Sequence, residues 1–155
     1  NKLNEIGNQK GSLSLAWFDR NKNNKIMMQL KNNIYNFFRN VANIPSNKVL
    51  WTTFKSSKEL MKGKGFAKSF VSLNIRATNQ YSDRIAIAYM ANRYLNPLIK
   101  TYFANNGIKV NDNRYALSEL IQFIFRSAIR NNKEILIYLP SSRMRKLLQE
   151  WIDKE

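Results

Sequence analysis

Three side chains in the C-terminal third of the chain, Gln122, Arg126 and Arg130, are spaced by four residues. On a helix this spacing places them along one edge. Two guanidinium groups on one edge suit phosphate oxygens, because each offers a forked pair of donors and keeps its charge. The sequence has no cysteine and no histidine, which excludes thiol nucleophiles, imidazole acid-base catalysis and Cys/His zinc sites. The alternative interpretation is a solvated helix edge whose arginines pair with Glu119 or Glu134.

A polar segment at 76–81 forms a second candidate site. It follows an apolar stretch that we expect to be a strand, and ligands of open α/β sheets gather at loops that leave the C-terminal ends of strands. Arg76, Thr78 and Asn79 would bind phosphates and sugars, and Tyr81 would stack on a base. The alternative is ordinary turn chemistry followed by a helix cap.

Basic side chains interleaved with aromatic residues form a third candidate site between positions 48 and 84, and binding there would depend steeply on salt. Two more cations fall in the first turn of the last expected helix, against the preference of the helix dipole. A bound phosphate would offset that conflict, whereas the alternative is that these side chains reach solvent without a partner. The cations assigned to nucleic acid in these two regions are Lys55, Lys58, Lys62, Lys64, Lys68, Arg143 and Arg145.

The composition places these candidates on a folded, strongly basic domain. The 155 residues include 26 Lys and Arg against 10 Asp and Glu, a formal net charge of +16, and 44% of them are hydrophobic. The charge predicts a polyanionic partner, and the apolar content is too high for a disordered basic tail. Residues 1–111 hold 18 basic and 4 acidic side chains, whereas residues 112–155 hold 8 and 6. The large positive charge of residues 1–111 therefore predicts binding to a polyanionic polymer. The few arginines of the C-terminal third are better candidates for binding one specific phosphate.

Several motifs of nucleotide and metal sites are missing from the sequence. It has neither G-x-x-x-x-G-K-[ST] nor G-x-G-x-x-G, and no cluster of carboxylates, so we expect no metal site and no hydrolysis of a nucleotide by this chain alone. It has no apolar run of about 18 residues and no export signal, so we expect a cytoplasmic protein without membrane contact. The start at Asn1 predicts a piece of a longer protein from a bacterium, or from a phage or plasmid living in one.

The elements that would position these residues are predicted from hydrophobic periodicity. Helical stripes alternate with short apolar runs and no hairpin turn joins two strands, so we expect an α/β domain with a mainly parallel sheet flanked by helices. Residues 1–24 would be an extension or a linker, and residues 25–155 a single basic domain. The expected helices span 25–42, 84–103 with a bend at Pro97, and 116–130, with a short helix ending at Met61 and a last one capped by Ser141 or Ser142; the expected strands span 48–55, 69–74 and 134–139, the last covered on both faces.

The segment from Gln122 to Arg130 resembles motif VI of superfamily 2 helicases, Q-x-x-G-R-x-x-R, which precedes the last strands of the second RecA-like domain. Residues 48–55 and 70–81 lie where that domain has motifs IV and V. Phe125 stands where the family has glycine, the second arginine comes four residues after the first instead of three, and 70–81 lacks T-x-x-x-x-G. The stretch 48–153 also looks like the C-terminal portion of DEAD/DEAH-like proteins of mobile elements and phages of low-GC Gram-positive bacteria.

The resemblance implies a RecA-like lobe of a nucleic-acid-dependent ATPase. Arg126 and Arg130 would then stabilise charge on the transferring phosphoryl group, and Gln122 and Asn79 would help to bind ATP with Mg²⁺, held mostly by an absent N-terminal lobe of the same protein. DNA or RNA would be the other partner. The alternative is a non-enzymatic DNA- or RNA-binding module of a mobile-element replication or regulatory protein. Binding to anionic membranes is disfavoured, because the basic residues do not form one amphipathic helix face.

Overall fold

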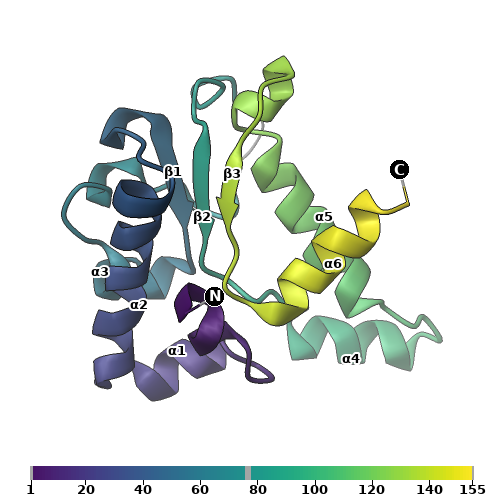
Figure 1. Ribbon diagram of the computed structural model, residues 1–155. Helices are drawn as coiled ribbons and strands as arrows, with labels where there is room; N and C mark the ends of the chain where they lie inside the picture. The colour runs from purple at the N-terminus through teal and green to yellow at the C-terminus, as the bar shows by residue number, and fades with distance from the viewer. Residues whose placement is uncertain (1, 76–77, 155) are drawn as a thin grey trace.

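A parallel sheet lies at the centre of the molecule (Figure 1). The structure is a computed structural model that describes residues 2–75 and 78–154. Within these ranges the strands β1 (Val49–Thr52), β2 (Ala86–Tyr89) and β3 (Leu136–Tyr138) pair in the order β1-β2-β3. Parallel pairing confirms the expected α/β class, because each crossover carries helices to a face of the sheet.

Helices cover both faces of the sheet (Figure 1). On one face, α1 (Leu15–Asn21), α2 (Lys25–Asn36) and α3 (Lys58–Met61) pack with Trp51 and Ala88 into one core cluster. On the other face, α5 (Asp112–Ile124) and α6 (Ser142–Ile152) pack with Ile87 and Tyr89 into a second cluster. A further helix, α4, spans Pro97–Asn105; a π-helical turn spans Phe37–Val41, and 3₁₀ turns span Lys2–Gly7, Ser46–Lys48, Lys55–Ser57, Ala67–Ser69 and Ala128–Asn131.

The expected helix over 84–103 is wrong in its first half, where the structure has the central strand β2. All four residues of β2 are buried, because both neighbouring strands and both helical layers contact it. A strand covered on both faces has a continuous apolar run, and such a run has no period that separates it from a buried helix. Pro97 begins α4 instead of bending a longer helix.

Three other features differ from the expectation: the extent of one strand, the end of one helix and the burial of the last strand. The expected strand 69–74 is reduced to one parallel bridge between Trp51 and Phe70. The expected helix 116–130 ends at Ile124. The strand β3 is an edge strand, and its first residue, Leu136, is 49% exposed, so it is not covered on both faces. The cap of the last helix is as expected, because the Ser141 hydroxyl accepts the Met144 backbone N–H.

Residues 2–24 belong to the packed core, whereas the sequence suggested an extension or a linker. Leu13, Trp17 and Phe18 are buried in the cluster that covers one face of the sheet. The Tyr138 hydroxyl of β3 donates to the Leu3 carbonyl, and the Asn92 backbone N–H donates to the Leu13 carbonyl at 2.8 Å. The N-terminal segment is therefore tied to strands that lie far from it in the sequence.

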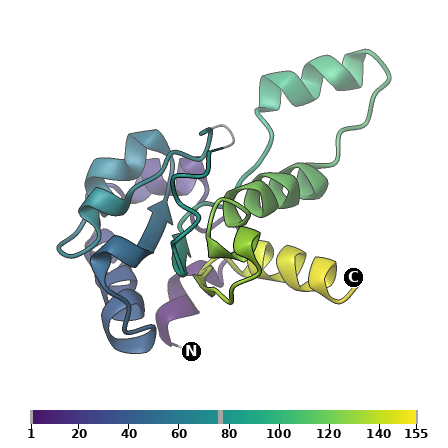
Figure 2. The same cartoon turned by 90° about the horizontal axis from the view of Figure 1, so that it is seen from above.

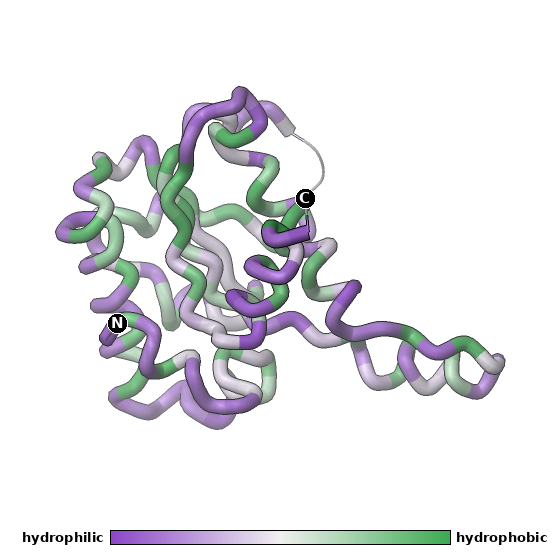
Figure 3. The backbone as a smooth tube through the Cα atoms, turned by 45° about the vertical axis from the view of Figure 1, so that its right-hand side comes forward, coloured by the Kyte–Doolittle hydropathy of each residue, from purple (hydrophilic) through white to green (hydrophobic). Residues whose placement is uncertain are grey.

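The helix α4 projects from the body of the molecule as an arm (Figures 2 and 3). None of its described residues is buried, and Leu98 is 79% exposed. The Asp112 carboxylate holds the arm: it accepts the Leu95 backbone N–H at 3.0 Å and pairs with Lys100. The hydrogen bond from Lys100 keeps the pKa of Asp112 below its ordinary value.

We expect Asp112→Asn to loosen the arm. The amide oxygen still accepts the Leu95 N–H but loses the charge that holds Lys100, so amide exchange in α4 should speed up about two- to fivefold at pH 7. Because the pKa of Asp112 is lowered, its stabilisation is present above the ordinary pKa of 3.8 and is lost as the pH falls through the lowered value. The difference between the two proteins should therefore shrink toward acid pH. Equal exchange rates at pH 7 would contradict the assignment, and Asp19→Asn, on α1, is the control.

Candidate functional site

The three residues spaced by four do not share a helical edge. Gln122 lies on the exposed side of α5 and donates to the Ser118 hydroxyl at 3.2 Å. The helix then ends, and the Ala128 backbone N–H donates to the Arg84 carbonyl at 2.9 Å. This bond draws the chain toward the amino end of β2, so Arg126 falls in a turn and Arg130 in a 3₁₀ turn.

The Arg126 side chain is turned inward, and the residue is only 8% exposed. Its guanidinium donates to the Ile75 carbonyl and lies 5.5 Å from the centre of the Phe123 ring. Burial lowers its pKa, and one terminal nitrogen has no hydrogen-bond partner among the residues that the structure describes. Arg126 therefore anchors the chain at Ile75 and exposes little of its guanidinium to solvent.

Arg130 is exposed and joins the first and second candidate sites. Its guanidinium donates to the Thr78 carbonyl at 3.3 Å and to the Asn79 side-chain oxygen at 2.5 Å. A shallow cavity of about 260 Å³ lies beside it, lined by Gln122, Phe125, Arg126 and Arg130. The segments that match motifs V and VI thus meet at the amino ends of the strands. The expected position at the C-terminal end of a strand is wrong, because 69–74 forms only one bridge and 78–84 leads into β2. Arg76 lies outside the described residues.

The chain between Tyr81 and Arg84 extends this surface toward β1. The Arg84 guanidinium lies 6.0 Å from the centre of the Tyr81 ring and donates to the Asn47 carbonyl. Lys48 pairs with Asp83 at 2.9 Å, and the hydrogen bond from Lys48 lowers the pKa of that carboxyl. One acidic side chain is therefore already neutralised within a cluster of cations.

A groove of about 550 Å³ continues the same surface. It is lined by residues 46–47, 63–69 and Arg84, and it contains Lys64 and Lys68, both exposed. The other lysines of the third candidate site are dispersed. Lys62 pairs with Glu59, and Lys58 lies 4.8 Å from the centre of the Phe70 ring. Lys55 follows the carboxyl end of β1 and so lies toward the opposite end of the sheet.

The two arginines at the start of α6 bind the chain itself and not an external phosphate. Arg143 donates to the side-chain oxygens of Asn113 and Asn92 and to the carbonyls of Arg93 and Asp112. Arg145 donates to the Leu139 and Pro140 carbonyls and to the Asn8 side chain, and burial lowers its pKa. Carbonyl oxygens thus offset the conflict of these cations with the helix dipole.

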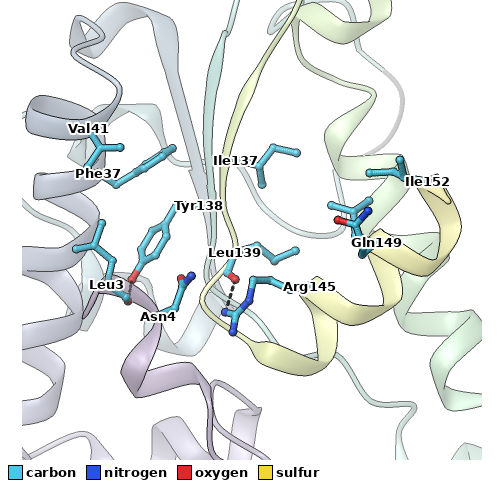
Figure 4. Close-up of a pocket in the computed structure, with 11 residues that line it drawn as sticks. Leu3, Asn4, Phe37, Val41, Ile137, Tyr138, Leu139, Arg145, Gln149 and Ile152 are labelled. Carbon is cyan, nitrogen blue, oxygen red and sulfur yellow. Dashed lines mark hydrogen bonds between the residues drawn. The ribbon is translucent and has the colours of Figure 1, made fainter. Parts of the chain in front are cut away.

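A cavity of about 350 Å³ lies between the N-terminal segment, β3 and α6 (Figure 4). Its walls are mostly apolar, with Leu3, Phe37 and Ile137 among them. Three of its polar side chains are engaged within the protein: the Tyr138 hydroxyl bonds to Leu3, Arg145 bonds to Leu139 at 2.9 Å, and Gln149 bonds to Asp153 (Figure 4 shows the first two). This cavity is a packing feature of the N-terminal segment.

The carboxyl ends of β1 and β2 carry polar residues that the sequence interpretation missed. Arg93 pairs with Glu119 at 2.9 Å and donates to the Tyr115 hydroxyl at 2.9 Å. Beside them, Tyr94 is 44% exposed at the rim of a cavity of about 610 Å³. The run from 85 to 91 would have pointed to this place, because residues that follow a central strand lie at its carboxyl end.

Metal-ligand clusters and membrane-spanning helices were both sought in ranges 2–75 and 78–154. No group of three or more Asp or Glu side chains there is placed to hold a metal ion. No helix there is long and apolar enough to cross a bilayer.

Comparison with known proteins gives one family and one curated relative. Residues 1–152 match the family model described as the YonV C-terminal Rossmann-like domain. The chain is 48% identical over 153 residues to the SPbeta prophage-derived protein YonV of Bacillus subtilis (strain 168), covering 99% of this chain and 37% of that relative. The relative comes from a prophage, a mobile element of the expected kind. No solved structure matches. The chain therefore belongs to the family of YonV C-terminal Rossmann-like domains.

Proposed function

We propose that this domain is the C-terminal lobe of a nucleic-acid-dependent ATPase, in which Arg130 contacts ATP that is held mostly by another lobe of the same protein. The contact between Arg130 and Asn79 carries the proposal. It joins two segments 51 residues apart in the sequence, as the resemblance to motifs V and VI requires, and it leaves the guanidinium at the surface.

The residues present fit the phosphates of ATP better than they fit its metal ion. Arg130 offers forked donors for phosphate oxygens, and Gln122 and Asn79 offer amide donors beside it. The described residues provide no carboxylate cluster for Mg²⁺, so the ion would be held by the other lobe. Mg²⁺ neutralises phosphate charge when it is bound. The task of Arg130 is to add positive charge where negative charge develops.

The experiment is ATP hydrolysis by the full-length protein with and without DNA or RNA. We expect turnover that nucleic acid stimulates and that the isolated domain lacks. A full-length protein that binds nucleic acid without hydrolysing ATP would rule out the ATPase and leave a second candidate, a nucleic-acid-binding module of a mobile-element protein. The groove that contains Lys64, Lys68 and Arg84 supports nucleic-acid binding in both candidates.

Both candidates require the groove to bind the phosphate backbone, so we expect Lys64→Ala/Lys68→Ala to weaken binding. The isolated domain should bind DNA at 50 mM salt and lose most of this binding at 300 mM. Removing two phosphate contacts should reduce the slope of log affinity against log salt by about 2. Filter binding over a salt series measures both effects.

Two other exposed lysines provide the control for this experiment. Lys25 begins α2 and Lys146 lies on α6, both outside the groove, so Lys25→Ala/Lys146→Ala removes the same charge elsewhere. Its salt slope should stay that of the unmodified domain. If both double variants lose affinity and slope equally, binding depends on net charge and the groove is not the site.

A further inference from the structure

The order in which the chain visits the sheet creates a crevice at one place. After β1 the chain passes to Phe70, which bridges to Trp51 of β1 on one side, and then crosses to β2 on the other side. The chain therefore passes to one side of β1 and then to the other, as at a reversal of winding, with Phe70 contributing one bridge and no strand. In open α/β sheets a crevice opens outside the carboxyl ends of the strands at such a reversal, and ligands bind there.

The cavity of about 610 Å³ lies at this reversal. Phe54, just after β1, forms one wall, and residues 92–97, just after β2, form another. Residues 10–11 and 14–16 of the N-terminal segment form a third wall. The volume falls in the range of small-ligand pockets, and mostly apolar walls with a few polar groups are their usual lining.

Two tyrosine rings of the cavity, Tyr94 and Tyr115, contact arginines that are themselves held by hydrogen bonds or an ion pair. The Arg143 guanidinium lies 4.2 Å from the centre of the Tyr94 ring, and four hydrogen bonds to neighbouring oxygens fix it there. Arg93, itself paired with Glu119, holds the Tyr115 hydroxyl. Tyr94 is nonetheless 44% exposed, so it presents a fixed aromatic surface at the rim. Fixed, exposed rings are the platforms on which nucleobases stack.

The charge around the cavity favours an anionic ligand. Lys10 lines it, the Arg143 guanidinium lies over the Tyr94 ring at its rim, and no Asp or Glu is among the described residues of its walls; Arg93 also lines it but is already paired with Glu119. An aromatic platform with cations at its edge matches a base that carries a phosphate.

We propose that this cavity binds an unpaired nucleobase, either of a free nucleotide or of a single strand, by stacking against Tyr94. The inference rests on the nucleic-acid-binding part of the proposed function and is independent of ATP hydrolysis. It lies at the carboxyl ends of the strands, whereas Arg130 and the lysine groove lie at their amino ends.

The test compares a fluorescent 12-nucleotide oligo(dT) with the matching 12-base-pair duplex by anisotropy. Tyr94→Ala in the isolated domain should weaken single-strand binding about tenfold and leave duplex binding within twofold. The salt slope should stay unchanged, because no phosphate contact is removed. Tyr94→Phe keeps the ring and should restore binding. Tyr102→Ala, an exposed tyrosine of α4 outside the cavity, is the control.

Competition with free AMP distinguishes whether the bound base belongs to a free nucleotide or to a single strand. Competition by AMP that Tyr94→Ala abolishes assigns the cavity to a free nucleotide, and a Tyr94-dependent single-strand preference without such competition assigns it to a strand. Single-strand binding and AMP competition that are both unchanged in Tyr94→Ala, or equal losses for strand and duplex, would overturn the inference alone. A domain that binds neither DNA nor AMP would overturn it together with the nucleic-acid-binding part of the proposed function.

Discussion

Arg130→Ala is expected to lower the nucleic-acid-stimulated ATP turnover of the full-length protein about 1000-fold, the scale of an arginine that stabilises a transferring phosphoryl group. Arg130 is exposed and bonds to Thr78 and Asn79 at the surface, so its removal leaves no buried polar group without a hydrogen-bond partner. The free energy of unfolding should change by about 0.5 kcal/mol or less. Release of phosphate at saturating nucleic acid measures turnover, and thermal unfolding checks the fold.

Two further variants make the Arg130 result specific. Lys133→Ala removes another exposed cation three residues away and should leave turnover within twofold. Arg130→Lys keeps the charge but loses the planar fork, so it should recover only part of the activity. If Arg130→Ala turns over ATP at nearly the rate of the unmodified protein, Arg130 has no role in hydrolysis. Its role is then structural: it joins the 3₁₀ turn at 128–131 to Thr78.

Arg126 is unsuitable as a probe of the same chemistry, although the resemblance to motif VI predicts the same role for both arginines. Its guanidinium is buried against Phe123 and bonds to the Ile75 carbonyl. Truncating a buried, hydrogen-bonded charge destabilises the fold, so lost activity would not distinguish catalysis from structure. Arg126 is a positioning residue that anchors the chain at Ile75, whereas Arg130 contacts Thr78.

The α/β class followed from the sequence because the runs at β1 and β3 and the Ser141 cap are local signals. The central strand did not, because β2 owes its conformation to pairing with β1 and β3, and its buried alanines and isoleucine fit a helix equally well. The same limit explains why Gln122 and Arg126 do not share a helical edge. The helix α5 ends at Ile124, and the chain beyond it is held by the hydrogen bond from Ala128 to the Arg84 carbonyl, a contact between residues distant in the sequence.

The internal use of Arg143 and Arg145 was also beyond local reasoning. The partners of Arg143 include Asn92 and Asn113, and one partner of Arg145 is Asn8, which is 137 residues away. Counting the cations in the sequence gives the charge of these side chains but does not identify their hydrogen-bond partners. Asn8 reaches Arg145 only when the N-terminal segment docks on α6, and the partners of Arg143 reach it only when α5 and the chain after β2 pack beside α6.

Gly7→Ala is expected to destabilise the whole domain, by at least about 2 kcal/mol. A Cβ at position 7 would overlap the Pro140 carbonyl and lie 2.8 Å from the Ser141 nitrogen, and both are backbone groups. The N-terminal turn would have to move away from the start of α6, which would strain the bonds of Asn8 to Arg145 and of Leu3 to Tyr138. Urea unfolding measures the loss.

The expected loss follows from the N-terminal segment being part of the core and not a linker. Leu13, Trp17 and Phe18 would lose their packing if the segment detached, so unfolding should remain one cooperative transition at a lower midpoint. Gln9→Ala, an exposed change two residues away, should stay within about 0.5 kcal/mol of the unmodified domain. If Gly7→Ala unfolds at the same urea concentration as Gln9→Ala, residues 2–24 contribute nothing to the stability of the sheet, and they act as the extension that the sequence first suggested.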